Sequence, residues 1–355
     1  MFSCYTPFFF ALFSQLEIRR TNPADPTSHF AMFSSEDIRP REVLIQVPRD
    51  LLISPDEEVE EKSQLQCETI NILLIEMRKV MDGKESAHGP YVKYLLSQPM
   101  GQLPSTWSQS GKDLLTDILG QSEEDDEIST ILPPHSPVGW LENDWVEDCK
   151  GSSDPFEMNA AALLLMRSWD DLLIPVFDYM SHRNGKWLNT DSSSVHENTP
   201  VKVFASRMIE AGEEIYTSYN MCRDCGGRAT SYGTPEMLRD YGFVEDYPQR
   251  WIFHNEELGY EIDEAVDDEG IPNGELELTK WILEKPDITD LEWLTDMLEM
   301  QKDTAEMYLS DQKDIPQKEW DVIVKYQRAL VTAIEIGIHK MKDMELFIDS
   351  AASEL

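Results

Sequence analysis

Hydrophobic and polar positions alternate along several short stretches, and this alternation predicts β-strands. In the best example Val201, Val203 and Ala205 fall on one face, while Lys202 and Phe204 fall on the other. A period of two is typical of a half-buried strand. Further expected strands or extended pieces are residues 43–48, 51–53, 212–219, 250–253 and 260–262.

Apolar residues spaced three or four apart predict helices elsewhere. The spacing holds from Gln66 to Met81 and stops before Gly83, and residues 157–169 are rich in strong helix formers. Thr289 and Glu292 have the spacing of a capping box, which begins a helix by satisfying free backbone amides. Two further helices are expected at residues 111–119 and 320–347.

The order of these elements predicts an α+β fold: a β core of short strands, interrupted by a helical insertion and followed by a mainly helical C-terminal domain. We expect residues 1–28 to be irregular. A domain over residues 29–247 follows, with the insertion at about residues 60–170, and residues 248–355 form the helical domain. No tandem repeat is present in the sequence.

The chain is strongly acidic. It has 30 Lys and Arg against 68 Asp and Glu, a formal net charge of -38. Such a field repels phosphate backbones, so we expect no direct nucleic-acid binding. The charge suits a basic protein partner, and solubility is the simpler explanation for it.

Five scattered cysteines indicate a reducing compartment and no disulfide framework. Cys222 and Cys225 have the spacing of zinc ligands, but no second pair completes a set of four. We therefore expect an ordinary loop there and no metal site.

No apolar run reaches the roughly 20 residues that span a bilayer. The apolar residues 5–13 are about as long as the core of a signal peptide, but no basic segment precedes them. We expect no membrane association and a monomer. Cytoplasm or nucleus is favoured without a firm assignment.

Four motifs occur in a recognisable order: Arg167, then Asp178-Tyr179-Met180-Ser181-His182, then Gly212-Glu213-Glu214-Ile215-Tyr216-Thr217-Ser218-Tyr219, then Tyr241-Gly242-Phe243. With them, the chain resembles the SET-domain protein methyltransferases over roughly residues 30–345. It is most similar to the branch typified by plant Rubisco large-subunit lysine methyltransferase. The resemblance implies a protein-lysine N-methyltransferase that uses S-adenosylmethionine (SAM) and acts on a protein substrate.

The resemblance also implies a role for each matching residue. Tyr219 matches the tyrosine at the methyl-transfer point. The positions that match cofactor-binding residues are Ala31, Arg167, Ser181, His182, Tyr241 and Phe243. The positions that match substrate-binding residues are Arg167, Asp178 and Tyr219.

The chemistry makes sense of these residue types. Methyl transfer from a sulfonium to an amine is an in-line displacement, which positioning and electrostatics accelerate. The lysine amine must be neutral, although its ordinary pKa is about 10.4. An apolar channel beside a cation disfavours the ammonium form, and a tyrosine hydroxyl can orient the amine lone pair.

Two departures from the family pattern count against activity. Ser181 stands where the family has Asn, and a hydroxyl lacks the paired donors and acceptor of an amide. His29-Phe30-Ala31 stands where the family has Gly-x-Gly, which allows close backbone approach to the cofactor. A non-catalytic SET-like binding module is therefore one alternative, and methylation of histidine instead of lysine is another.

Each site residue also has a structural interpretation. His182 alone is typical of a turn, Arg167 of a helix end, and Tyr241 and Phe243 of a core. The enzyme hypothesis requires Ser181-His182 and Tyr219 to meet at one place in the fold.

Overall fold

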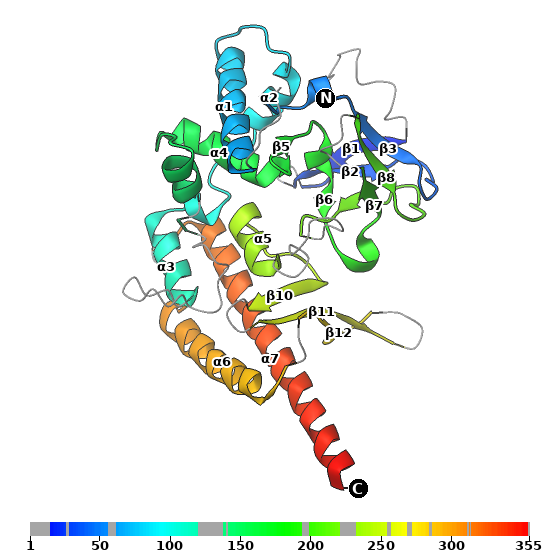
Figure 1. Cartoon of the computed structure of the whole chain (residues 1–355), viewed down its shortest axis with the longest axis vertical. Helices are drawn as coiled ribbons and strands as arrows, with labels where there is room; N and C mark the ends of the chain where they lie inside the picture. The colour runs from blue at the N-terminus through cyan, green and yellow to red at the C-terminus, as the bar shows by residue number, and fades with distance from the viewer. Residues whose placement is uncertain are drawn as a thin grey trace. The chain divides into compact units, whose positions relative to one another are not determined.

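The computed structural model describes residues 15–25, 28–55, 62–119, 138–139, 141–193, 199–220, 232–253, 257–267, 272–283, 286–310, 312 and 314–353. The chain divides into two compact units (Figure 1). The first unit consists of Met1–Gln98 and Trp145–Tyr219, and the second of Pro99–Asp144 and Asn220–Leu355. The predicted domain limits at residues 28/29 and 247/248 stay a prediction.

Short strands build the β core of the first unit. An antiparallel sheet has the order β3–β8–β7, and β6 and β9 form a separate parallel pair. In β8, Val201, Val203 and Ala205 are buried while Lys202 and Phe204 are partly exposed, which confirms the predicted alternation. The strands are β1 (Leu16–Arg20), β2 (Phe30–Ser34), β3 (Val43–Val47), β4 (Ser168–Trp169), β5 (Leu172–Leu173), β6 (Ser181–His182), β7 (Thr190–Ser192), β8 (Val201–Ala205) and β9 (Tyr216–Thr217).

The irregular segment predicted at residues 1–28 is wrong for residues 16–20. These residues form β1, which pairs antiparallel with β2 from Leu16↔Ser34 to Arg20↔Phe30. The sequence of β1 is LEIRR, too short and too charged to stand out by alternation alone. The pairing with β2 supplies the backbone partners that make it a strand.

In the sequence, the helices of the first unit fall between strands β3 and β4. They are α1 (Lys62–Met81), α2 (Gly89–Leu96) and α4 (Pro155–Arg167), and α1 packs against the other two. Asp154 caps α4 by accepting hydrogen bonds from the amides of Phe156 and Glu157. Arg167 is the last residue of α4, as predicted. Residues 49–51 form a 3-10 turn, and Ile53 bridges to Leu173.

A disulfide joins Cys67 in α1 to Cys149, with the two Cα atoms 5.3 Å apart. The prediction of no disulfide is therefore wrong. The two cysteines are 82 residues apart in the sequence, so only the folded chain brings them together. Cys222 and Cys225 lie outside the described residues.

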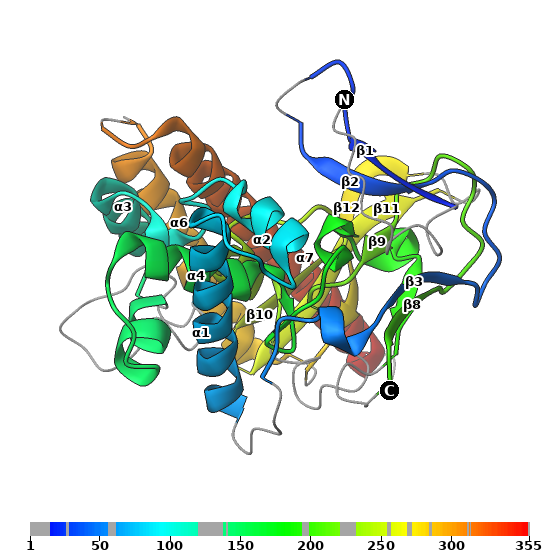
Figure 2. The ribbon, with the colours of Figure 1, turned by 90° about the horizontal axis from the view of Figure 1, so that it is seen from above.

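The second unit combines one antiparallel sheet with long helices. The sheet has the order β10 (Gln249–Phe253), β11 (Leu258–Val266) and β12 (Pro272–Trp281). The helices are α3 (Gln109–Leu119), α5 (Thr234–Tyr241), α6 (Ile288–Tyr308) and α7 (Gln317–Ser353). In Figures 1 and 2, α6 lies beside both α3 and α7, and all three contribute to one apolar core with the sheet.

Two sequence predictions in this unit need correction. Strand β12 was not expected, although its Glu275, Leu276, Glu277 and Leu278 do alternate. The predicted capping box was placed two residues too late. Asp287 is the N-cap of α6 and accepts from the amides of Thr289 and Asp290, because the helix begins at Ile288.

Candidate functional site

The parallel pair β6–β9 brings the Ser181-His182 motif to the segment that ends at Tyr219. Ser181 lies opposite Tyr216 and His182 opposite Thr217. The backbone amide of Tyr219 donates to Nδ1 of His182 at 3.0 Å, and the two rings are 5.1 Å apart. The predicted meeting of these two motifs is confirmed. Since Nδ1 accepts a hydrogen bond, a neutral His182 carries its proton on Nε2.

The Tyr219 hydroxyl is held in place and stays neutral. It donates to the carbonyl oxygen of Met180 at 2.7 Å. Burial raises the pKa of Tyr219 to about 12, with Asp178 and Glu214 adding to the rise and Arg167 opposing it. At neutral pH the oxygen therefore keeps its proton and retains lone pairs that can accept a further hydrogen bond.

Arg167 and Asp178 form a buried pair that is only loosely closed. Nη1 of Arg167 is 4.0 Å from Oδ2 of Asp178, and the arginine instead donates to the Tyr94 hydroxyl at 3.3 Å and to Gln98 at 3.0 Å. Nη1 of Arg167 also donates to the backbone carbonyl of Asp178 at 3.4 Å. Among the residues that the structure describes, neither carboxylate oxygen of Asp178 has a partner within hydrogen-bond distance, and Nε of Arg167 has none. Burial raises the pKa of the Asp178 carboxyl to about 7, although Arg167 lowers it.

Two tyrosines that the site prediction missed complete this cluster. Tyr91 and Tyr94 lie three residues apart on α2, and both hydroxyls are near enough to the Asp178 carboxyl to lower its pKa. The ring of Tyr94 is 4.7 Å from that of Tyr179. The i, i+3 spacing places both tyrosines on one helix face, which a helix prediction for this stretch could have indicated.

The backbone just before Asp178 is strained. Val176 has φ of 79°, which is a rare conformation for a β-branched residue. Strain of this kind costs about 1–3 kcal/mol and persists only where the surrounding structure imposes it. The turn that it begins, Phe177–Tyr179, carries Asp178 into the buried cluster.

The hydroxyl of Ser181 is engaged by a carboxylate. Ser181 donates to Oε1 of Glu214 at 2.5 Å, and the Tyr216 hydroxyl donates to Oε2 at 2.9 Å. Asn189 holds the same segment, since its side chain bonds the Glu214 carbonyl and the Tyr216 amide at 2.8 Å each. Sequence reasoning missed Glu214, because its partner is 33 residues earlier in the chain.

Ala31 lies in β2 and is fully buried. The next residue, Met32, accepts a hydrogen bond from the amide of Ile215 at 2.8 Å, and Phe33 bridges to Glu214. Strand β2 therefore runs beside the segment that leads into β9.

Tyr241 and Phe243 belong to the second unit. Tyr241 ends α5, and Gly242 follows with φ of 72°, which favours glycine. A Cβ at Gly242 would lie 2.0 Å from the carbonyl oxygen of Gln102, so a side chain is excluded there. The two rings are 6.3 Å apart. Their predicted roles toward a cofactor stay a prediction.

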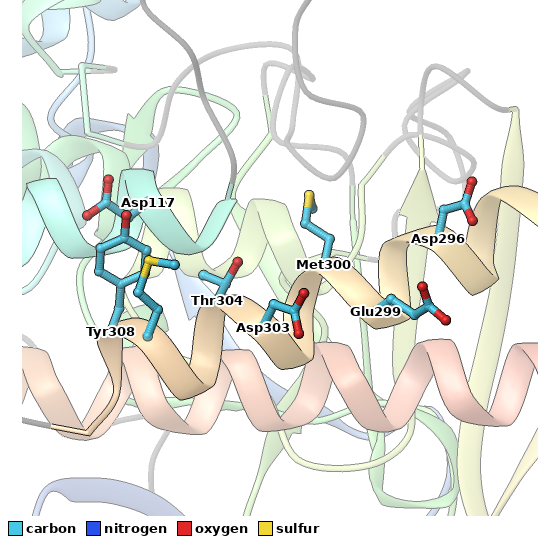
Figure 3. Close-up of a pocket in the computed structure, with 8 residues that line it drawn as sticks. Asp117, Asp296, Glu299, Met300, Asp303, Thr304 and Tyr308 are labelled. Atoms are coloured by element: carbon cyan, nitrogen blue, oxygen red, sulfur yellow. The ribbon is translucent and has the colours of Figure 1, made fainter.

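A surface pocket of the second unit contains none of the predicted site residues. It is formed mainly by α6, with Asp117 contributed by α3 (Figure 3). Asp296, Glu299 and Asp303 make it acidic. Among the residues that the structure describes, no group of three His, Cys, Asp or Glu side chains is arranged to hold a metal ion. In the same described part of the chain, no helix is long and apolar enough to cross a membrane.

The SET domain family model matches residues 29–220, which is more than half of the 355-residue chain. The protein belongs to the SET domain family. The resemblance inferred from the motifs is thereby confirmed. No curated protein sequence matches the chain.

Two solved structures share the fold. One is Rubisco LSMT bound to sinefungin and monomethyllysine, at 14% identity and a TM-score of 0.50, and the alignment covers 94% of this chain and 88% of that chain. The other is the SET domain of LSMT bound to lysine and AdoHcy, at 12% identity and a TM-score of 0.50, with the same two coverages of 94% and 88%. The predicted fold class, a SET-type α+β core with a helical insertion and a mainly helical C-terminal region, is confirmed.

Proposed function

We propose that this protein is a SAM-dependent N-methyltransferase that modifies a lysine side chain of a protein substrate. The observation that carries the proposal is the meeting of His182 and Tyr219 at the β6–β9 pair, beside the loosely closed Arg167–Asp178 pair. In a SET domain protein these positions match the cofactor motif, the reaction centre and the substrate side. The related LSMT structures hold lysine or monomethyllysine together with AdoHcy or sinefungin.

The residues of the first unit fit a cationic cofactor and an amine substrate. Buried polar atoms in native proteins are nearly always hydrogen-bonded, by protein, water or ligand. Both carboxylate oxygens of Asp178 and Nε of Arg167 lack such partners among the described residues. The carboxylate of Glu214, which is hydrogen-bonded to Ser181, adds a negatively charged acceptor to this group of residues.

In the first unit, the residues that would hold SAM are Ala31, Arg167, Ser181 and His182; the cofactor roles of Tyr241 and Phe243 stay a prediction from the family resemblance. When bound, SAM supplies a sulfonium methyl group that an amine can displace in line. The neutral hydroxyl of Tyr219 is fixed by its bond to Met180. A lone pair of this oxygen can accept a hydrogen bond from an N–H of the amine, and that bond orients the amine's own lone pair for the reaction.

Asp178 is suited to the substrate side of the site. With a pKa of about 7, it is partly ionised at neutral pH and attracts an incoming lysine ammonium. The Asp178 side chain is buried, and the nearby rings of Tyr94 and Tyr179 are 4.7 Å apart. Exclusion of water disfavours the ammonium form and lowers the pKa of the lysine toward the neutral amine that reacts.

The chain's acidity supports a basic protein as substrate. A formal net charge of -38 attracts a lysine-rich surface at long range, and salt screens this attraction. Rising ionic strength is therefore expected to slow association of enzyme and substrate.

The test is incubation of the purified protein with isotopically labelled SAM and a whole-cell protein extract, followed by identification of the labelled residue. Label on a lysine of one or a few proteins is the expected result. Label on histidine would change the substrate residue and keep the enzyme class. No transfer together with no binding of SAM would favour the binding module, for which the replacement of Asn by Ser181 is the supporting observation.

A further inference from the structure

Two successive glutamates, Glu213 and Glu214, lie shortly before β9 in the sequence, and their side chains have different partners. Glu213 forms an ion pair with Arg207 at 2.6 Å and accepts from the amide of Glu210. Glu214 accepts from two neutral hydroxyls, those of Ser181 and Tyr216. In the part of the chain that the structure describes, no Lys, Arg or His forms an ion pair with Glu214. Arg183 acts on the Tyr216 hydroxyl, whose pKa it lowers, while the charge of Glu214 itself is oriented by hydrogen bonds without a direct ion pair.

The position of Glu214 directs this charge toward the candidate site. Phe33 in β2 forms a β-bridge with Glu214, and the side chain of Glu214 accepts a hydrogen bond from Ser181 in β6. Ser181 directly precedes His182, whose ring contacts Tyr219. The charge of Glu214 contributes to the raised pKa of Tyr219, so the carboxylate lies within electrostatic range of that hydroxyl.

The pair of Ser181 and Glu214 changes what this position offers to a ligand. An Asn side chain presents a neutral carbonyl acceptor and an amide donor. Ser181 uses its proton on Glu214, so together they present acceptors with a full negative charge. A carboxylate is the stronger partner for a cation, because charge-assisted hydrogen bonds are roughly twice as strong as neutral ones.

SAM carries two positive groups, the α-ammonium of its methionine part and the sulfonium. Only the ammonium has N–H donors, so only the ammonium can hydrogen-bond to a carboxylate. A partly buried carboxylate held by two hydroxyls and lacking an ion pair is suited to this group.

We propose that Glu214 is a cofactor-binding residue that accepts a hydrogen bond from the α-ammonium of SAM, and that Ser181 and Tyr216 position its carboxylate. Glu214 thereby takes over the contribution of the Asn that this chain lacks at Ser181. This inference rests on the proposed function, since it specifies how the same site holds SAM.

The test is calorimetric titration of the full chain and its Glu214→Gln variant with three ligands. SAM carries the ammonium and the sulfonium, S-adenosylhomocysteine keeps only the ammonium, and 5′-methylthioadenosine has neither. Loss of a hydrogen bond to a charged group costs roughly tenfold to a hundredfold in affinity. We expect Glu214→Gln to weaken SAM and S-adenosylhomocysteine by this factor and 5′-methylthioadenosine by less than about threefold.

Glu213→Gln is the matched control, because it removes the same charge from the neighbouring residue. It breaks the ion pair with Arg207 and is expected to lower the unfolding temperature while leaving the ratio of the three affinities unchanged. Ser181→Ala tests the positioning role without removing the carboxylate. It should weaken both ammonium ligands by about threefold to tenfold, the size of one neutral hydrogen bond.

Rescue gives a second, independent readout. Ser181→Asn in the Glu214→Gln background restores a family-type acceptor, and we expect it to recover at least half of the lost free energy of SAM binding. Absence of any recovery would overturn the claim that Glu214 replaces the missing Asn.

The remaining outcomes separate this inference from the proposed function. If the parent protein binds none of the three ligands, the proposed function fails. If the parent binds all three and Glu214→Gln weakens them equally, Glu214 is purely structural and only this inference fails. Weakening of SAM alone would show that Glu214 acts on the sulfonium, and it would also overturn the assignment to the ammonium.

Discussion

The two compact units each contain a buried arginine–aspartate pair, and the two pairs are built differently. In the second unit, Arg239 donates to both oxygens of Asp240 at 2.6 and 2.9 Å, and the Tyr232 hydroxyl also donates to Asp240. In the first unit, Nη1 of Arg167 is 4.0 Å from Oδ2 of Asp178, and among the described residues neither carboxylate oxygen has a partner within hydrogen-bond distance. The closed pair is the arrangement that stabilises the folded state by itself. We interpret the open pair as one whose missing hydrogen bonds are made by a bound substrate or cofactor.

Removing the arginine should therefore destabilise the two units to different extents. Arg239→Met leaves the Asp240 charge buried, which typically destabilises a protein by about 3–5 kcal/mol. Arg167→Met is expected to cost less than half as much, because the raised pKa of Asp178 lets that carboxyl take up a proton near neutral pH. Denaturant unfolding at pH 7 measures both. Equal costs would show that the two pairs have the same structural role.

The open pair should also destabilise the protein as pH rises. The folded pKa of Asp178 is about 7 against an ordinary value of 3.8, so between these values the folded state keeps a proton that the unfolded state has lost. The free energy of unfolding then falls with rising pH across this window, by at most about 4 kcal/mol from this group.

Asp178→Asn removes this titration and keeps a neutral side chain of the same shape. Relative to the parent, the variant is expected to gain stability between pH 5 and pH 8. Chemical denaturation at both pH values provides the comparison. An unchanged difference between parent and variant across that range would mean that Asp178 is already ionised at pH 5.

The disulfide distinguishes the units in a third way, because both Cys67 and Cys149 belong to the first unit. A disulfide closing a loop of this length typically stabilises by about 2–4 kcal/mol. Reduction should lower the unfolding temperature of the parent and leave a Cys67→Ser, Cys149→Ser variant unaffected. A parent protein that is insensitive to reductant would contradict the disulfide.

The parts of the fold that the sequence predicted are those whose signal is local. Strand β8 and helices α1 and α4 have clear periodicity over their own residues. Strand β1 depends on its pairing with β2, which no local pattern reveals. Strand β12 does alternate, but it begins at Pro272, within the stretch of residues 267–272 that predicts a turn.

The same distinction holds for the candidate site. Tyr219, His182 and Asp178 were predicted because ordered motifs carry them. The contact of Glu214 with Ser181 and the approach of Tyr91 to Asp178 join residues 33 and 87 positions apart. Such contacts depend on the fold, and so did the cysteine pairing that the sequence prediction missed.

Two buried tyrosines allow the central claim to be tested with a matched control. Tyr219 donates its hydroxyl to the Met180 carbonyl at 2.7 Å, and Tyr260 in the second unit donates to the Ala333 carbonyl at 2.9 Å. Substitution by Phe removes one neutral hydrogen bond in each case, so we expect each variant to lose about 1 kcal/mol of stability.

The decisive measurement is the initial rate of methyl transfer from labelled SAM to the substrate found in the extract, for the parent, Tyr219→Phe and Tyr260→Phe. Loss of one oriented hydrogen-bonding group at a reaction centre typically lowers the rate by about 10²–10³-fold. We expect that loss for Tyr219→Phe and a rate within about twofold of the parent for Tyr260→Phe. A Tyr219→Phe protein that transfers methyl groups as fast as Tyr260→Phe would contradict the assignment of Tyr219 to the reaction.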